Sequence, residues 1–227
     1  MKNKAFTLAE VLITLGIIGI VAAMTIPTLM AEYRKKVIET RLAKFYSIIN
    51  QAIQLAESNY GDRTNWDELG YGLIKDDEGN ETNVAVAEAW VKKYILPYIK
   101  SDVKMINKDG NVQLYFYDGS MVAISGSGWL FYPNANKYKL AENGYISQKD
   151  AGKHFFLFFY APTIQGTLGN EHIGNGVEPY KHGWDGTKEG LLHGWYGCAQ
   201  EINTRAYCTE LIKQNGWKIP DDYPIKI

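Results

Sequence analysis

Residues 6–31 have the sequence FTLAEVLITLGIIGIVAAMTIPTLMA, and their composition differs sharply from that of the chain after them. Between Glu10 and Glu32 lie twenty-one residues without a charge. At helical rise they span about 30 Å, which is the hydrocarbon thickness of a bilayer. The segment can therefore cross a membrane as one helix.

Two kinds of export signal share this hydropathy. A secretory signal peptide would use Lys2 and Lys4 as its basic region and Val21-Ala22-Ala23 as its cleavage site. Hydropathy alone leaves both readings open. Glu10 favours a membrane helix, because a carboxylate at the edge of the hydrocarbon is costly without a partner and a signal peptide has no use for one.

The string KAFTLAE at residues 4–10, with the apolar run after it, closely resembles the N-terminal signal of type IV prepilins. The match includes a short basic leader, a small residue, Phe-Thr-Leu, and a Glu shortly after the cleavage site. The resemblance implies that a prepilin peptidase cuts between Ala5 and Phe6 and methylates the new amino terminus. Ala5 stands where the family usually has Gly, and Ala is the smallest alternative with a side chain.

The resemblance further implies an α+β, pilin-like fold and a structural role. The chain would be a pilin or pseudopilin subunit of a type IV pilus or a type II secretion filament. Its size and its Gly-rich loops favour a minor or specialised subunit. Its partners would be homologous subunits, the prepilin peptidase, the inner-membrane assembly platform and, before assembly, membrane lipid. The expected divisions are a leader at 1–5, a membrane and filament-core helix at 6–31, its amphipathic continuation at 32–60 and a globular domain at 61–227.

The orientation in the membrane follows from the resemblance and not from loop charge. Arg34, Lys35 and Lys36 come directly after the apolar span, so the positive-inside rule does not choose a side. The resemblance places the helix in the inner membrane and the C-terminal part outside the cytoplasm, in an extracellular or periplasmic filament after assembly.

Several helix residues have expected roles in assembly. Glu10 would pair with the positive amino terminus of an adjacent subunit. Gly16 and Gly19 would allow close approach between helices. Pro27 has no N–H for the carbonyl of Ala23, so we expect a kink or local melting there.

The residues from Glu32 to about Tyr60 contain neither Gly nor Pro and predict one continuous amphipathic helix. A two-stranded coiled coil is the alternative, but the run is short and the sequence after it looks globular, which favours packing on the chain's own domain. Gly61 is a natural C-terminal cap. The apolar stripe consists of Ile38, Leu42, Phe45, Ile49, Ala52 and Ala56.

The rest of the chain predicts mixed structure. The polar stretch 61–83 is expected to be a loop with room for a short turn around residues 66–69. Residues 84–95 are expected to form a second helix that Pro97 ends or kinks. Beyond it the apolar period changes to two, and Asp109-Gly110 and Asp118-Gly119 predict tight turns of an antiparallel meander. The expected strands are Val103–Ile106, Val112–Tyr117 and Met121–Ile124, with one or two more in Trp129–Tyr132 and Phe155–Tyr160.

Candidate metal ligands are scattered through the Gly-rich residues 166–197. Their spacings fit neither a compact zinc motif nor an EF-hand loop, so a solvated surface loop is favoured and no metal or other cofactor is expected. The candidates are Glu171, His172, Glu178, His182, Asp185 and His193.

The sequence predicts no enzyme and no catalytic residue. It contains no Gly-x-Ser-x-Gly, phosphate-binding loop or His-Glu-x-x-His string. The 24 Lys and Arg nearly cancel the 25 Asp and Glu, so no overall field points to nucleic acid as the main ligand. The alternative is a membrane-tethered enzyme or ligand-binding protein that uses the helix as a simple anchor.

Cys198 and Cys208 are the only two cysteines of the chain. In a domain that the resemblance places outside the cytoplasm, two cysteines suggest one disulfide, which would stabilise the fold by roughly 3 kcal/mol on the chain-entropy estimate. The alternative is a pair of buried thiols in a helix spanning about residues 202–214. Many pilins close a C-terminal segment with such a bridge.

Overall fold

The structure is a computed structural model that describes residues 7–100, 102–142, 144, 146–163, 172–173 and 175–227, apart from the side chain of Asn83. The chain divides into two compact units at residue 38/39. Residues 7–38 are here called the N-terminal segment, and residues 39–226 the globular unit.

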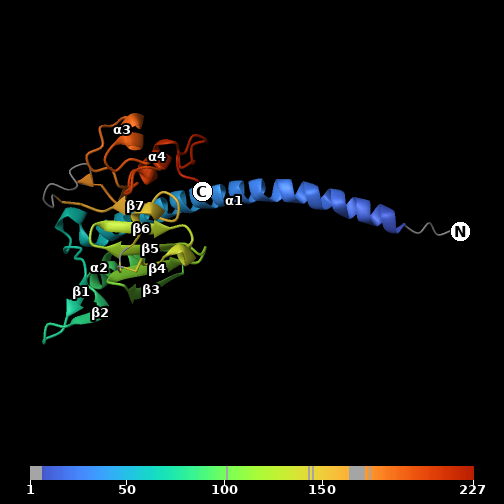
Figure 1. Cartoon of the computed structure of the whole chain (residues 1–227). Coiled ribbons are helices and arrows are strands. Elements are labelled where there is room, and N and C mark those ends of the chain that lie inside the picture. The colour runs from blue at the N-terminus through green and yellow to red at the C-terminus, as the bar shows by residue number, and fades with distance from the viewer. Residues whose placement is uncertain (1–6, 101, 143, 145, 164–171, 174) are drawn as a thin grey trace. The chain divides into compact units, whose positions relative to one another are not determined.

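One helix, α1 (Leu8–Tyr60), begins in the N-terminal segment and ends in the globular unit (Figure 1). Its end at Tyr60 confirms the prediction, because Gly61 follows with a φ of 76° and its N–H donates to the carbonyl of Glu57 at 2.9 Å. The helix is unbroken through Pro27, so the structure has no melted turn there, and the kink stays a prediction.

The globular unit is built around a six-stranded antiparallel sheet in the order β3-β4-β5-β6-β7-β8. With α1, this sheet confirms the predicted α+β class. The strands are β3 (Val103–Lys108), β4 (Asn111–Phe116), β5 (Met121–Ser125), β6 (Gly128–Tyr132), β7 (Phe156–Phe159) and β8 (Glu178–Pro179).

The two predicted hairpin turns connect β3 to β4 and β4 to β5. Asp109 and Gly110 have φ angles of 54° and 73°, as a two-residue turn with two left-handed residues requires. In the next turn Gly119 has a φ of 81°, and the Asp118 carboxylate accepts from the Ser120 N–H at 3.0 Å. Local turn chemistry therefore sets the register of the first three strands.

Each face of the sheet has its own cover. One face packs on α1, where Leu42, Phe45 and Ile49 are buried, and on α2 (Ala87–Tyr94) through Trp90 and Trp129. The other face carries a second core in which Tyr132 packs beside Phe155. The short helices η3 (Ala135–Lys137) and η4 (Gln148–Asp150) lie in the connection between β6 and β7.

The expectation of a loop over residues 61–83 is wrong in part. A short helix, η1 (Arg63–Asn65), is followed by an antiparallel hairpin of β1 (Leu73–Lys75) and β2 (Glu81–Ala85). Its turn is held by Asp76, whose Oδ1 accepts from the N–H groups of Glu78 and Asn80 at 3.1 and 2.8 Å. These polar turn residues hide the strands in the sequence.

The predicted second helix begins later than expected. Val84 lies in β2, and α2 begins at Ala87. Pro97 lies in the short helix η2 (Leu96–Tyr98) that follows α2, where its fixed φ suits a new helical turn.

The C-terminal part adds two short helices, α3 (Lys188–His193) and α4 (Cys208–Gln214). They pack in a cluster with Tyr180, Leu191, Tyr207 and Leu211, against Leu157 and Phe159 of β7. The prediction of a solvated surface loop is therefore wrong for the described part of residues 166–197, which contains β8 and α3 and contributes to a hydrophobic core. Residues 164–171 and 174 lie outside the description.

Candidate assembly site on the N-terminal helix

The first turn of α1 is held by a reciprocal pair of side chains. Glu10 Oε2 accepts from both the backbone N–H and the hydroxyl of Thr7, each at 2.8 Å. The Glu10 N–H in turn donates to Thr7 Oγ1 at 3.2 Å. This is a capping box, which satisfies backbone donors at the start of a helix. Sequence reasoning missed it, although Thr7-Leu8-Ala9-Glu10 carries the Thr-x-x-Glu signal.

The capping box fixes where the Glu10 carboxylate lies. Thr7 is its hydrogen-bond partner among the described residues, both contacts go to Oε2, and the side chain is exposed. Oε1 therefore remains open to a donor from another molecule. The predicted processing residues Ala5 and Phe6 lie outside the described residues.

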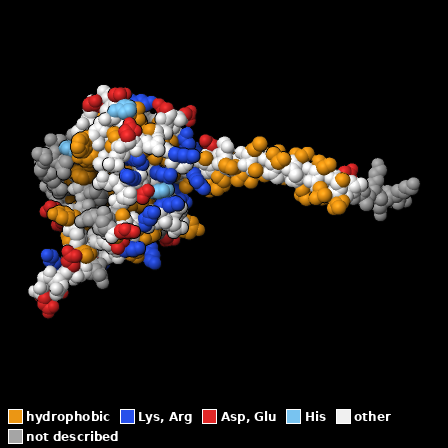
Figure 2. All heavy atoms as spheres, viewed as in Figure 1, with side chains coloured by type: hydrophobic (Ala, Val, Ile, Leu, Met, Phe, Trp, Pro, Cys, Tyr) orange, Lys and Arg blue, Asp and Glu red, His pale blue; other side chains and the backbone are white. Residues whose placement is uncertain are grey.

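Beyond Glu10 the helix exposes apolar side chains at consecutive positions and therefore all around its axis. Figure 2 shows one face of this apolar segment. α1 is the one helix of the described chain that is long and apolar enough to span a membrane, and its most apolar window has a mean hydropathy of 2.2. Two of its hydroxyls are hydrogen-bonded within the helix. Thr14 Oγ1 donates to the carbonyl of Val11 and Thr25 Oγ1 to that of Val21, both at 2.9 Å. Such bonds suit a segment surrounded by lipid or by other apolar helices.

The predicted close-approach residues, Gly16 and Gly19, lie on an open surface of this segment. A Cβ built at either position meets no atom within 4 Å. Both glycines therefore leave the backbone accessible to a second helix, as small residues do at helix contacts in membranes. Whether they make such a contact stays a prediction.

Within the globular unit, the last part of α1 is fixed to the sheet by aromatic packing. The Phe45 ring stacks on Phe131 with centroids 4.4 Å apart, and it meets Phe116 and Phe158 edge to face at 6.1 and 5.0 Å. These partners come from three different strands of the sheet. Phe45 therefore joins the helix to the centre of the sheet.

Polar groups join the same helix to the far edge of the sheet. Asn50 Nδ2 donates to the carbonyl of Val177 and its Oδ1 accepts from the Val177 N–H, both at 2.9 Å. Gly176 lies so close that a Cβ there would be 1.9 Å from Asn50 Oδ1. The Asn50 amide thus makes both backbone hydrogen bonds to Val177 that a neighbouring strand would otherwise make at this edge.

A partly buried ion pair adds to this junction. Tyr46 donates its hydroxyl to Glu178 Oε1 at 2.7 Å, and Lys213 of α4 pairs with Glu178 Oε2. Burial lowers the pKa of Lys213, but the hydrogen bond and the negative charge of Glu178 more than offset this, so that the pKa is raised. The helix, β8 and α4 are therefore coupled through one carboxylate.

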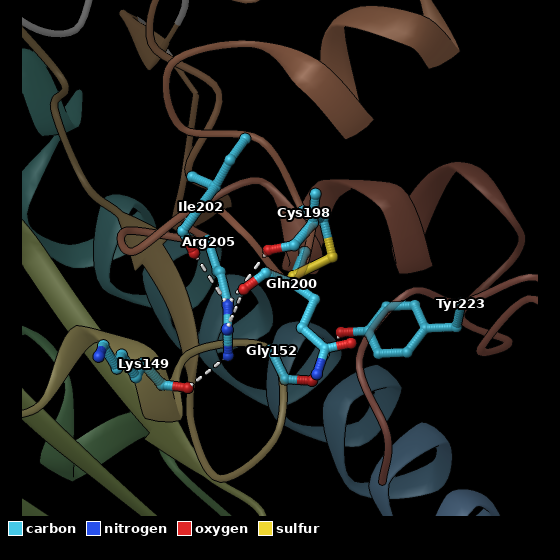
Figure 3. Close-up of a disulfide and its surroundings, with 9 residues drawn as sticks. Lys149, Gly152, Cys198, Gln200, Ile202, Arg205 and Tyr223 are labelled. Atoms are coloured by element: carbon cyan, nitrogen blue, oxygen red, sulfur yellow. Dashed lines mark hydrogen bonds between the residues drawn. A yellow bond between two sulfur atoms is a disulfide. The ribbon is translucent and has the colours of Figure 1, made fainter.

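The two cysteines form a disulfide in the structure, with Sγ atoms 2.05 Å apart. α4 begins at Cys208, so the alternative of two thiols within one helix over residues 202–214 does not hold. Inside the loop, Arg205 donates to the carbonyl oxygens of Ile202 and Gln200 at 2.9 and 2.6 Å (Figure 3). It also reaches the carbonyl of Lys149 at 2.7 Å. Arg205 thus ties the disulfide loop to the connection between β6 and β7.

Reduction of this disulfide tests both the bond and the compartment. We expect alkylation before and after reduction to differ by two thiols per chain, because both cysteines are buried and bridged. The measurement is intact mass after alkylation of unfolded samples. Equal labelling of reduced and unreduced chains would contradict the bridge and an oxidising location.

The candidate metal ligands do not come together. No group of three His, Cys, Asp or Glu residues suited to a metal occurs among the described residues. His172 is buried and not solvated as expected, and its Nε2 accepts from the Lys181 N–H at 3.2 Å. His193 and Asp185 are exposed, and Glu171 lies outside the described residues.

Comparison with known proteins identifies the N-terminal signal. A family model described as the prokaryotic N-terminal methylation motif matches residues 1–26. This is the signal of type IV pilins and pseudopilins, so the chain is a type IV pilin-like protein that carries the prepilin processing motif. The motif implies processing by a prepilin peptidase and assembly with other pilin subunits.

Most of the remaining chain matches a second model. Residues 28–227 match a family of unknown function (DUF6613), and the chain belongs to that family. No curated protein and no solved structure matches the chain.

Proposed function

We propose that this protein is a structural subunit of a type IV pilus or a type II secretion filament. The observation that carries the proposal is the methylation motif at residues 1–26, followed directly by an exposed apolar helix. Exposed apolar surface of this extent needs lipid or other apolar helices around it. A filament subunit encounters both, lipid before assembly and neighbouring helices after it.

The proposed divisions of the chain follow this cycle. Residues 1–5 are the leader, which a prepilin peptidase removes before it methylates Phe6. Residues 6–31 lie in the inner membrane and then in the filament core, and residues 32–60 continue the helix. Residues 61–227 complete the globular domain, which covers the filament surface outside the cytoplasm. The disulfide agrees with that location, because such bonds persist in oxidising compartments.

The proposed work is assembly and not catalysis. The helix packs against neighbouring helices through its apolar faces, and its junction with the sheet through Phe45 and Asn50 carries the globular domain along. An ATPase of the assembly platform would supply the energy.

The mature amino terminus tests the proposal directly, because the two export routes cut at opposite ends of the apolar run. Intact-mass and terminal-peptide analysis of membrane protein from cells with a prepilin peptidase should find a chain that begins at methylated Phe6. Cells without the peptidase should retain residues 1–5. A chain that begins near Met24 would exclude the proposal, because the membrane helix would then be lost.

A further inference from the structure

Four exposed lysines and a histidine form a basic patch on the globular unit. His154 is half-buried within it. Burial lowers the pKa of His154, Asp150 opposes this, and the charges of Lys137, Lys153 and Lys139 lower the pKa further. Lys149 lies in η4, and the Asp150 carbonyl accepts from the N–H groups of Lys153 and His154 at 3.2 and 2.8 Å, so these residues share one turn. Figure 2 shows Lys and Arg side chains gathered on one side of the unit. The basic patch consists of Lys137, Lys139, Lys149, Lys153 and His154.

The lysines of this patch differ from other lysines of the unit in their ion pairing. Lys44, Lys93 and Lys188 each pair with an aspartate at 2.6 to 2.9 Å. By contrast, none of the four patch lysines forms an ion pair with another residue in the part of the chain that the structure describes. The patch is therefore available to an anionic partner.

The patch lies at the end of the globular unit where α1 enters it. Arg41, near the start of the unit, donates to the carbonyl oxygens of Asp118 and Pro133. The Ala135 N–H donates to the carbonyl of Gly119 at 2.9 Å, and Lys137 ends the short helix that begins at Ala135. This end is separated from Tyr60 by about 30 Å of helix.

The opposite end of the unit is acidic. Residues 57–81, which include the last turn of α1, contain eight carboxylates and only two cations, Arg63 and Lys75. Hydrogen bonds place this segment beside the β5–β6 turn, where the Gly126 N–H donates to the carbonyl of Gly70 at 3.2 Å. The exposed carboxylates without an ion pair to a described residue are Asp62, Glu68, Asp76, Asp77, Glu78 and Glu81.

The acidic end also exposes apolar side chains next to its carboxylates. Tyr71 is 82% exposed, and Ile74, Val84 and Val86 are between 37% and 44% exposed. They come from the β1–β2 hairpin and the residues that flank it. Apolar groups with a charged rim are the usual composition of a protein interface.

We infer that the basic patch of one copy of this chain docks onto the acidic end of the next copy. The inference rests on the proposed filament function, in which helices lie parallel and successive copies are displaced along their axis. Parallel displacement brings the end of one unit near residue 39 toward the end of its neighbour near Tyr60. Opposite charges at those ends favour this head-to-tail contact between copies with parallel helices. They disfavour a side-by-side contact of parallel copies at the same level, in which like ends would meet.

Chemical cross-linking of the full chain in membranes tests the contact. A zero-length carbodiimide joins lysine amines to carboxylates, and a mixture of isotopically light and heavy chains identifies links between copies. We expect links from Lys137, Lys139 or Lys153 to carboxylates of residues 68–81. Their yield should fall in high salt, because exposed charges are screened.

Charge reversal makes the test specific. One variant carries Lys137→Glu, Lys139→Glu and Lys153→Glu, and a second carries Glu68→Lys, Asp77→Lys and Glu78→Lys. Each should lower association about tenfold or more, because like charges then meet across the contact. The chain with all six changes should recover to within about twofold of wild type. Lys75→Glu is the matched control, since it reverses a lysine within the acidic end and should not weaken association.

Association in these variants is measured by links at sites that the substitutions leave intact, such as Lys149 and Glu81. Wild-type levels in either three-fold variant would overturn the inference. A loss of association that the variant with all six changes fails to restore would also overturn the inference, because the lysines would then bind another anion such as lipid or nucleic acid. The absence of links between copies in wild-type membranes would overturn it too.

The same samples separate this inference from the proposed function. Chain released in sheared filaments reports assembly, and links between copies report the docking. Filaments without these links reject the docking and leave the filament proposal standing. Links without filaments support the docking and count against the filament proposal.

Discussion

Replacement of Glu10 with Gln is expected to leave a chain that is made, inserted and cut between Ala5 and Phe6 but that enters filaments about tenfold less than wild type or not at all. Cleavage creates a positive amino terminus at the membrane edge, and the Glu10 carboxylate can pair with that charge on an adjacent subunit. Pairing would both favour docking and set the axial register. The neutral amide of Gln cannot supply this attraction.

The capping box makes Gln the informative substitution. A Gln side chain can still accept from the Thr7 N–H and hydroxyl, so Glu10→Gln removes the charge and preserves the start of the helix. Glu10→Val removes both. If the charge acts in assembly, both variants should fail to the same extent. Thr7→Ala is the complementary control, since it removes the hydroxyl contacts of the capping box and keeps the carboxylate.

The measurement compares processed protein in membranes with protein in sheared filaments for all three variants and wild type. Normal assembly of Glu10→Gln with loss in Glu10→Val and Thr7→Ala would show that the cap matters and the charge does not. Normal assembly of every variant would reject a role for this turn.

The Phe45→Ala variant is expected to lose about 3–5 kcal/mol of unfolding free energy of the globular unit. Phe45 is 2% exposed, and its ring contacts three strands, so truncation leaves a cavity at the centre of the helix–sheet junction. The loss would be a large fraction of the stability of an ordinary domain. It would also loosen the attachment through which α1 carries the globular unit.

Two controls accompany this variant. Phe45→Leu keeps most of the volume and should cost much less, and Leu55→Ala truncates a side chain that is 40% exposed on the same helix. Denaturant unfolding of the full chain in detergent, followed by tryptophan fluorescence, measures all three. A loss in Phe45→Ala no larger than that in Leu55→Ala would show that the helix does not depend on this contact.

Local signals in the sequence predicted the features that depend on neighbouring residues. The apolar run after Glu10 and the stripe up to Tyr60 predicted α1, and Gly61 marked its end. The Asp-Gly pairs predicted two hairpins, because their backbone conformations are favoured by those residues themselves. The methylation motif likewise lies within one short stretch.

The sequence did not predict the β1–β2 hairpin, strand β8 or the burial of His172, because none of them is marked by an apolar pattern of consecutive residues. The β1–β2 hairpin is built from polar turn residues and short strands, so apolar periodicity does not reveal it. Strand β8 has only two residues and depends on β7 for its hydrogen bonds. His172 stood in a Gly-rich polar stretch, and only the packing against Phe159 and Tyr180 makes it a buried side chain.

The sequence by itself determined the membrane helix, its processing signal and the α+β class, because periodicity and motifs are properties of consecutive residues. Only the tertiary structure decided which distant residues meet. It joined Asn50 to Val177 and Arg205 to Lys149, and it placed the basic patch and the unpaired carboxylates of the β1–β2 hairpin at opposite ends of one unit. The near-zero net charge does not reveal this separation, because the net charge is a sum over the whole chain and is independent of where each charge lies.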